Sequence, residues 1–312
     1  MAETEETKRI VYKRYEDGFI VRKMLPEDGK IVQHWFFQLG IGMVISRADL
    51  DVTLSSFPKD CEGFYIGEYQ GKVVASAIRI PWGKVYYGSY YYVDETYRGK
   101  GFGTRLRDQV AREYVGNNIC CIDAVLGTVT EKNLSKFGYI LGFKTGHFRA
   151  TAKKNVVQYA SEIKKATDVS FDNLIEYDNK NFICPNVRER REFLKQWIDL
   201  PEGAAFVSLD ESGKIVGLGC RRICMQENSH TIGPLYADNL EIGNSLMQRM
   251  MEDIEGSSIE MNICYTNEDA LKMVELFGFK NSMNFQRMYL NADPGMPKKS
   301  VLAVTSLDVC GF

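Results

Sequence analysis

The two halves of this 312-residue chain show the same order of predicted helices and strands, and this repeat restricts the fold more than any other feature. Each half has two amphipathic helices, a hairpin and a further strand, followed by helix, strand, helix and strand. The hairpin turns are also alike, because Gln70-Gly71-Lys72 in the first half corresponds to Ser212-Gly213-Lys214 in the second. The chain is therefore predicted to contain two copies of one unit.

Both copies combine hairpins with helices. The first half is predicted to have strands at 18–25, 64–69, 73–80, 85–93, 119–126 and 143–152, and helices at 26–37, 47–55, 103–114 and 131–141. The second half is predicted to have helices at 170–182, 188–198, 239–254 and 267–277, and strands at 204–209, 214–224, 230–236, 258–264, 285–290 and 301–309. This pattern predicts an α+β fold with a mixed, mostly antiparallel central sheet flanked by helices.

The boundaries between the parts follow from composition. We expect a polar N-terminal tail at residues 1–17, a first domain at 18–155 and a second domain at 156–312. The Lys-rich segment 153–165 is the predicted linker between them.

Charge and cysteine usage exclude several classes of protein. The chain has 39 Lys and Arg against 41 Asp and Glu, so no overall basic field attracts nucleic acid or anionic membrane. The first six residues are acidic, unlike a targeting peptide, and no apolar run approaches the roughly 18 residues of a membrane span. The eight cysteines form no C-x-x-C pair, so we expect free thiols and no metal site. We expect a cytoplasmic protein, with the nucleus as the alternative; the oligomeric state is left open.

A glycine-rich segment, Arg98-Gly99-Lys100-Gly101-Phe102-Gly103, lies between the Tyr-rich strand 85–93 and the helix 103–114. The first N–H groups of a helix lack internal partners and carry the positive end of its dipole, and glycines allow a phosphate to approach the backbone. Arg98 and Lys100 add positive charge, and Thr104 adds a hydroxyl. The segment is therefore predicted to bind a pyrophosphate.

Other glycine-rich loops fit this segment less well. The spacing lacks the four residues that precede Gly-Lys-Ser/Thr in a Walker loop, and the chain has neither His-Arg-Asp nor Asp-Phe-Gly of a kinase. A dinucleotide fingerprint needs its third glycine one place later, in a parallel strand-helix-strand unit. A structural turn with incidental glycines is the remaining alternative.

The segment resembles the cofactor motif of the GNAT superfamily of acetyl-CoA-dependent N-acetyltransferases, which is Arg or Gln, two residues, Gly, one residue, and Gly or Ala. Arg98, Gly101 and Gly103 match it. The resemblance implies acetyl-CoA as co-substrate, with the pantetheine arm paired to the backbone of Tyr91, Tyr92 and Val93. It implies a pyrophosphate site formed by Arg98, Gly99, Lys100, Gly101, Phe102, Gly103 and Thr104. Asn133 is implied as a contact to the pantetheine or adenine moiety.

The resemblance also suggests catalytic groups. The family often places its general acid, a Tyr, four positions before a Gly-Phe pair, and that position is Gly138 here. The adjacent Tyr139 is therefore the predicted acid, with a packed side chain as the alternative. An alkyl ammonium with a pKa of about 10 must lose a proton before its nitrogen can attack. Glu95 is the predicted base, and Glu68, Asp123 or a water chain are the alternatives.

The corresponding turn of the second half has lost the phosphate-binding pattern. It contains Gly233-Pro234-Leu235-Tyr236-Ala237-Asp238-Asn239, followed by Glu241. The carboxylates of Asp238 and Glu241 would repel a pyrophosphate, so this half is not expected to bind the cofactor in the usual way. The whole chain resembles tandem GNAT proteins in which an active-looking first domain precedes a degenerate copy.

The predicted function is transfer of an acetyl group from acetyl-CoA to a primary amine, by direct attack in a ternary complex. A small amine, an amino acid, a peptide or a protein lysine is the open set of acceptors. The second domain is expected to shape the acceptor pocket or a partner surface. The alternative is a catalytically silent protein that binds or senses acyl-CoA, or an interaction module.

Overall fold

The helices and strands of a computed structural model, which describes residues 10–38, 46–57, 62–127, 134–182, 187–295 and 298–309, follow the predicted order in both halves. The first half contains β1 (Val11–Arg14), β2 (Phe19–Lys23), α1 (Pro26–Gln38), α2 (Asp49–Ser56), β3 (Phe64–Tyr69), β4 (Lys72–Trp82), β5 (Val85–Val93), α3 (Phe102–Thr104), α4 (Arg112–Val115), β6 (Ile119–Val125) and β7 (Ile140–Thr151). The second half contains β8 (Glu162–Lys165), α6 (Phe171–Asn181), α7 (Val187–Ile198), β9 (Ala204–Leu209), β10 (Ile215–Ile223), β11 (Ser229–Ala237), α8 (Leu240–Glu252), β12 (Ser258–Cys264), α9 (Glu268–Leu276), β13 (Lys280–Leu290) and β14 (Val301–Ala303).

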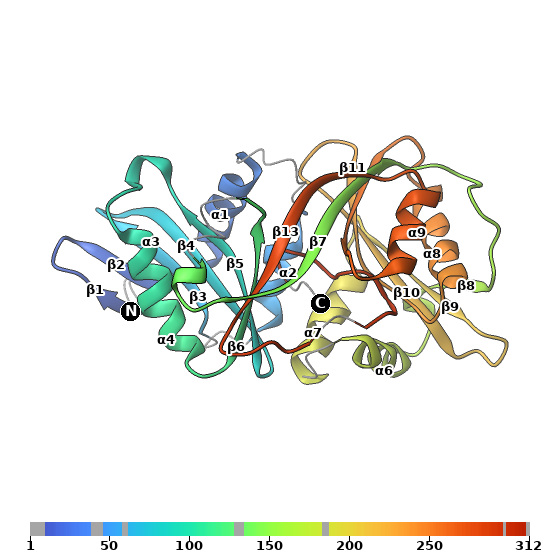
Figure 1. Cartoon of the computed structure of the whole chain (residues 1–312), viewed down its shortest axis with the longest axis horizontal. Coiled ribbons are helices and arrows are strands. Elements are labelled where there is room, and N and C mark those ends of the chain that lie inside the picture. Colours follow the sequence, from blue (N-terminus) through green and yellow to red (C-terminus); the bar gives the residue numbers. More distant parts are fainter. Residues whose placement is uncertain are drawn as a thin grey trace, which may run out of the picture.

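These strands form one sheet that runs through both halves (Figure 1). Its order is β1-β2-β3-β4-β5-β6-β13-β7-β12-β11-β10-β9-β8, and β14 pairs with β11. Neighbouring strands are antiparallel except for β5 with β6 and β11 with β12, which are parallel. The mostly antiparallel sheet with its flanking helices confirms the predicted α+β class.

The closing strands of the two halves are exchanged. Strand β13, from the second half, pairs with β6 of the first half over Phe285–Leu290, and β7 of the first half pairs with β12 of the second. The two exchanged strands also pair with each other at the centre of the sheet. The predicted boundary between 18–155 and 156–312 stays a prediction, but a fragment that ends at residue 155 would leave β6 without its β13 neighbour.

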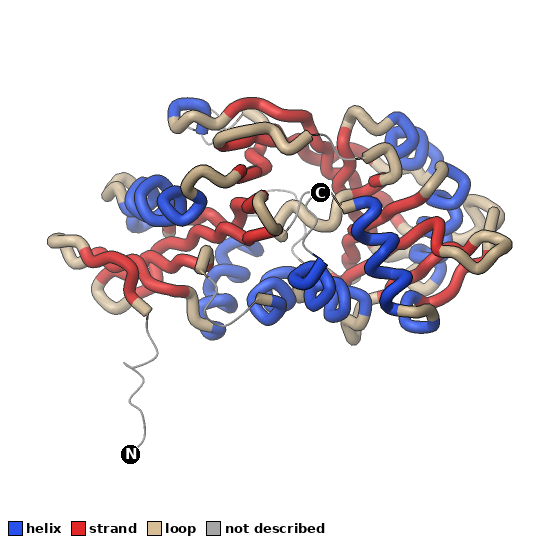
Figure 2. The backbone as a smooth tube through the Cα atoms, turned by 90° about the horizontal axis from the view of Figure 1, so that it is seen from below, coloured by secondary structure: helices blue, strands red, loops and turns tan. Residues whose placement is uncertain are grey.

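Helices cover both faces of the sheet (Figure 2). One apolar cluster contains side chains of α1, α2, α6 and α7, and it runs across the junction because Trp82 contacts the rings of Phe182 and Phe193. On the other face, the helical segment that starts with α3 packs on the first half and helices α8 and α9 pack on the second. The core of the protein is therefore shared between the halves.

Three predicted segments differ from the structure. The predicted tail 1–17 contains strand β1, whose Tyr12 packs edge-on against Tyr65 with 5.2 Å between ring centroids. The predicted linker 153–165 contains β8, which pairs with β9 and is too short and polar to show a clear strand pattern. The predicted strand 301–309 is a strand only over Val301–Ala303, because the segment then leaves the sheet and its carbonyls accept side-chain hydrogen bonds.

Two predicted helices also differ. In the segment 131–141, of which residues 131–133 lie outside the described residues, helix is present only at 134–136, and β7 begins at Ile140 rather than Phe143. Gly138 has φ +85°, and the N–H groups of Gly138 and Tyr139 donate to the carbonyls of Ser135 and Leu134, a glycine-containing C-terminal cap that stops the helix. The helix at 103–114 is observed as α3, a π-helical stretch over Arg105–Ala111, and α4. No helix within the described ranges is both long and apolar enough to cross a membrane.

Candidate active site

Strand β5 carries a bulge at the point where it separates from β6. The ladder between β5 and β6 ends at Gly88 and Ile122, and no strand of the described residues pairs with that edge of β5 beyond Gly88. On the other edge Ile78 pairs with Ser89 and Ser76 with Tyr92, so Tyr90 and Tyr91 together face one residue of β4. Tyr90 has φ +46°. The backbone of β5 is therefore open to a ligand between β5 and β6.

The glycine loop follows β5 and leads into α3. Gly99 and Gly101 have φ values of +80° and +79°, and a Cβ added at either would meet no atom within 4 Å. These glycines are therefore needed for backbone conformation, and the space beside them is open. Gly103 differs, because its Cβ would lie 2.3 Å from the Tyr91 hydroxyl oxygen. Close packing between α3 and β5 requires that glycine.

A cavity of about 570 Å³ joins the loop to the open part of β5. It is lined by Tyr91, Tyr92, Val93, Tyr97, Arg98, Gly99, Gly101, Phe102, Gly103 and Thr104. Of the residues predicted from the sequence to bind the cofactor, only Lys100 and Asn133 are not in this set, and Asn133 lies outside the described residues. Tyr97, which was not predicted, lines the cavity from the turn after β5.

The charged residues of the loop have partners on the end of β5 and in the turn that follows it. The Arg98 guanidinium donates to Glu95 Oε1 at 2.9 Å and to the Val93 carbonyl at 3.1 Å, and it lies over the Tyr92 ring. The Lys100 ammonium lies 5.2 Å from the ring centroid of Tyr97. Glu95, the predicted base, is therefore paired with Arg98 and is mostly exposed to solvent.

Tyr139, the predicted acid, is buried beside β6. It packs in a cluster with Val115, Leu134 and Cys120. Burial, followed by the nearby Cys120, raises the pKa of Tyr139 above its ordinary value of 10. The phenol is thus protonated at neutral pH. Tyr139 is not among the residues that line the cavity, so its role stays a prediction.

Each carboxylate proposed as a base from the sequence has a cationic partner. The pairs are Glu95 with Arg98 at 2.9 Å, Glu68 with Arg22 at 2.7 Å and Asp123 with Arg287 at 2.6 Å. The structure brings a further carboxylate, Asp308, to the start of the bulge, where its backbone carbonyl accepts a hydrogen bond from the Ser89 hydroxyl. Ser89 and Asp308 are 219 residues apart, so no local pattern in the sequence indicates this contact.

The equivalent region of the second half is filled by the chain. Strand β11 separates from β12 after Ile232, and β14 pairs with β11 at Leu235 and Tyr236 on this side. The Val304 N–H donates to the Asn262 carbonyl of β12 at 3.0 Å, which closes the gap. At Gly243, near the start of α8, a Cβ would lie 2.1 Å from the Leu302 side chain. The C-terminal segment therefore occupies the place that is a cavity in the first half.

The turn before α8 has structural partners. The Asn239 side chain caps α8 by accepting from the Ile242 N–H at 2.9 Å, and Asp238 accepts from Lys180 at 2.8 Å and from the Tyr177 hydroxyl at 3.0 Å. These polar side chains hold the turn in place.

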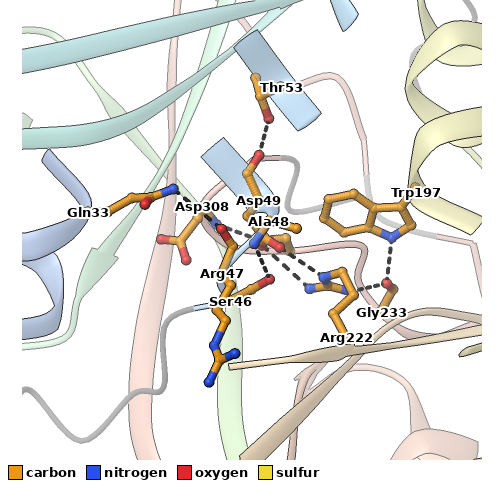
Figure 3. Close-up of polar contacts among 11 residues, drawn as sticks. Gln33, Ser46, Arg47, Ala48, Asp49, Thr53, Trp197, Arg222, Gly233 and Asp308 are labelled. Atoms are coloured by element: carbon orange, nitrogen blue, oxygen red, sulfur yellow. Dashed lines mark hydrogen bonds and ion pairs between the residues drawn. The ribbon is translucent and has the colours of Figure 1, made fainter. Parts of the chain in front are cut away.

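A second cavity, of about 420 Å³, lies between the halves. Residues from α2, from α7 and from the loop at 200–203 line it, together with Arg47, Arg222 and Ile223. Arg222 of the second half reaches across the junction, because its Nε donates to Asp49 Oδ1 of α2 at 2.8 Å (Figure 3). Its Nη1 donates to the Gly233 carbonyl within the second half. The Trp197 indole N–H also donates to Gly233, at 2.9 Å. This cavity is thus built jointly by both halves.

Comparison with known families gives one match in each half. The model described as "Acetyltransferase (GNAT) family" matches residues 33–143. The model described as "Acetyltransferase (GNAT) domain" matches residues 174–302. Together these matches span more than half of the chain.

Individual proteins are similar over almost the whole length. A holothin acyltransferase from Pseudoalteromonas sp. (strain SANK 73390) is 25% identical over 287 residues, which are 91% of this chain and 92% of that protein. A crystal structure of a putative acetyltransferase from Pyrococcus horikoshii superposes with a TM-score of 0.73 at 17% identity, covering 95% of this chain and 97% of that one. A tandem GNAT protein from the clavulanic acid biosynthesis pathway superposes with a TM-score of 0.62 at 13% identity, covering 90% of this chain and 100% of that one.

Proposed function

This chain belongs to the GNAT superfamily of acyltransferases and carries two of its domains in tandem, and we propose that its first half transfers an acetyl group from acetyl-CoA to a primary amine. The cavity at the glycine loop, continuous with the open edge of β5, is the observation that carries the proposal. The amides from Gly99 to Thr104 hold the pyrophosphate. The backbone of Tyr91, Tyr92 and Val93 pairs with the pantetheine arm.

We propose that the amine attacks the acetyl carbonyl directly, with both substrates bound. Direct attack needs a neutral nitrogen, a donor for the carbonyl oxygen and a proton for the departing sulfur. A backbone N–H on the open edge of β5 serves as the donor to the oxygen. Tyr139 supplies the proton to the sulfur, and its raised pKa keeps the phenol protonated at neutral pH.

The Tyr139→Phe variant tests that role. If Tyr139 is the acid, kcat falls by roughly 100-fold or more, the lower range for a general acid. The dissociation constant for acetyl-CoA stays the same, because the hydroxyl makes no contact with the pyrophosphate. Steady-state kinetics and calorimetry measure the two quantities. Tyr159→Phe, which removes an exposed hydroxyl bonded to Glu252, is the matched control. An unchanged kcat in Tyr139→Phe would mean that Tyr139 serves only packing.

We further propose that the second half forms part of the acceptor site. Support comes from the cavity between the halves, because Arg222 lines it and also binds Asp49 on α2. Helices α1 and α2 cover the face of the sheet on which Tyr90 and Tyr92 contact Trp35 and Phe36. An amine entering on this face would approach β5 from the side opposite α3.

The direct test follows thiol release from acetyl-CoA in the presence of a panel of amines. The panel contains holothin, because a similar protein is a holothin acyltransferase, together with small alkyl amines, free amino acids and a lysine peptide. Thiol release that depends on an amine is the expected result. Tight binding of acetyl-CoA with no release for any amine would favour the alternative, a silent acyl-CoA sensor. A parallel series of longer acyl-CoAs identifies the preferred donor.

A further inference from the structure

The C-terminal segment, residues 301–309, fills the gap between β11 and β12 of the second half. It then continues to the first half, where the gap between β5 and β6 is open. Beyond β14, which pairs with β11, the chain continues to Tyr87 and Ser89 on β5. Three side chains of the first half donate hydrogen bonds to its carbonyls: Tyr87 to Leu307 at 2.8 Å, Ser89 to Asp308, and Trp82 to Val309 at 3.1 Å. These contacts place Asp308 where β5 and β6 separate. The acyl end of a pantetheine arm that runs along β5 from the glycine loop would reach the same place.

Two polar side chains at this place have no hydrogen-bond partner within the described ranges. The Tyr90 hydroxyl is buried and unbonded, and Tyr90 as a whole is 3% exposed. The carboxylate of Asp308, which is partly buried, likewise makes no ion pair or hydrogen bond there; only its backbone groups are bonded. Buried polar groups usually find partners, so the unbonded Tyr90 hydroxyl indicates a polar ligand that is bound during function, and the partly exposed Asp308 carboxylate beside it is open to the same ligand.

The neighbouring carboxylate, Asp49, has a different environment. It accepts from Arg222 at 2.8 Å and from the Ser306 hydroxyl at 2.6 Å. Its charge is therefore balanced by Arg222, whereas no cation among the residues that the structure describes pairs directly with Asp308 (Figure 3). Of the two, Asp308 is the carboxylate that is free to take a proton from a substrate.

We infer that Asp308, which the second half contributes to the first, accepts the proton of the acceptor ammonium before the amine attacks. This inference rests on the proposed acetyl transfer. The ammonium gives one proton to the Asp308 carboxylate, and the nitrogen then forms a bond to the acetyl carbon while the carbon–sulfur bond breaks. A second proton leaves the nitrogen and one proton is taken up by the sulfur, from Tyr139 in the mechanism proposed above. Asp308 returns its proton to solvent, and Tyr139 regains one from the nitrogen.

The electrostatic surroundings suit this role. Burial, followed by the Asp49 carboxylate, raises the pKa of Asp308 to about 7, and Arg222 opposes the shift. A base is most effective when its pKa lies near the working pH. Within the described part of the chain, further titratable groups that face this region are Asp51 on α2, Tyr90 on β5, Cys224 next to β10, and Arg47, whose guanidinium donates to the Cys224 carbonyl. The excess of carboxylates favours a cationic acceptor over an anionic one.

The test is the Asp308→Asn variant, which keeps the size of the side chain and removes the base. With an alkyl amine that the wild type acetylates, kcat/KM is expected to fall by about 100-fold or more, as for loss of a general base. The acetyl-CoA dissociation constant is expected to be unchanged. In the wild type, kcat/KM is expected to rise with pH and to level off above about 7. In the variant it is expected to keep rising toward the pKa of the amine, about 10, because only the free amine can then react. Asp172→Asn, on the exposed surface of α6, is the control that keeps full activity.

The outcomes separate the inference from the function on which it rests. An Asp308→Asn enzyme with wild-type kcat/KM and the same pH profile overturns the role of Asp308 and leaves the acetyl transfer standing. A wild-type protein that releases no thiol with any amine overturns both. Asp308→Glu, which restores a carboxylate, is expected to recover part of the activity. A Glu variant that is as inactive as Asn, although it binds acetyl-CoA normally, also argues against the inference.

Stability gives a readout that does not depend on turnover. The pKa of Asp308 is raised on folding from 3.8 to about 7, so the folded state holds this proton more tightly than the unfolded state. The resulting stabilisation is present at low pH and is lost as the pH rises toward 7. Asn does not titrate, so the stability of Asp308→Asn relative to wild type is expected to increase from pH 4 to pH 7. A constant difference across that range, measured by denaturant unfolding, would contradict the assigned environment of Asp308.

Discussion

Replacing Gly101 by Glu is expected to abolish acetyl-CoA binding while the protein stays folded. Gly101 has φ +79°, a conformation that costs a residue with a side chain about 1–2 kcal/mol. A carboxylate at about 4 Å from a phosphate charge near a protein surface adds repulsion on the order of 4 kcal/mol. The dissociation constant should therefore rise at least about 100-fold, equivalent to about 2.8 kcal/mol. Isothermal titration calorimetry measures the change.

Gly213→Glu is the matched control for this variant. Gly213 has φ +80° and equally open surroundings, but it lies in the hairpin turn of the second half. The two substitutions introduce the same backbone strain and the same charge at different places. The control should bind acetyl-CoA as the wild type does. Equal affinities in both variants would remove the glycine loop from the binding site.

The second large effect is expected at the exchanged strands. Arg287 on β13 and Asp123 on β6 form a buried ion pair at 2.6 Å, and the Arg287 guanidinium also lies over the ring of Phe143. In Arg287→Met the Asp123 carboxylate would stay buried without its cation. Breaking a buried pair in this way costs about 3–5 kcal/mol. Denaturant unfolding should show this loss, and both halves should lose stability together because they share the strand.

Two further variants define the origin of that loss. Arg191→Met breaks an exposed pair with Asp172 and should cost about 1 kcal/mol or less. The double variant Arg287→Met with Asp123→Asn removes both charges, so it should recover part of the stability lost in the single variant. A single variant that unfolds at the wild-type denaturant concentration would show that the pair does not hold the exchanged strands.

Much of the fold was predictable because its signals are local. Apolar periodicity and glycine-containing turns predict the helix at 239–254, which is observed at Leu240–Glu252, and the strand at 258–264, which agrees with β12. The exchange of β7 and β13 has no local signal. Each strand has a Gly-Phe pair at or near its start, Gly142-Phe143 within β7 and Gly278-Phe279 just before β13, so either one matches the pattern of a neighbour for β6. Contacts such as Arg287 with Asp123, which are 164 residues apart, determine the actual pairing.

The part of the site that is contiguous in sequence was also predictable, whereas the contacts between distant residues were not. The glycine loop and the end of β5 are contiguous in sequence, and the spacing of Arg98, Gly101 and Gly103 indicates their joint role. Ion pairing is not visible in the sequence, so Glu95 could not be recognised as a partner of Arg98. Asp308 could not be recognised either, because the C-terminal segment reaches β5 only after crossing from the second half. That crossing also closes the second cleft, through the packing of Leu302 against Gly243.

The chain is expected to bind one acetyl-CoA, in the first half, although it contains two similar domains. The stoichiometry of acetyl-CoA binding to the intact wild-type protein, measured by titration calorimetry, tests this expectation most directly. One molecule should bind per wild-type chain, and none per Gly101→Glu chain. Two molecules bound per wild-type chain, or one that persists in Gly101→Glu, would contradict it.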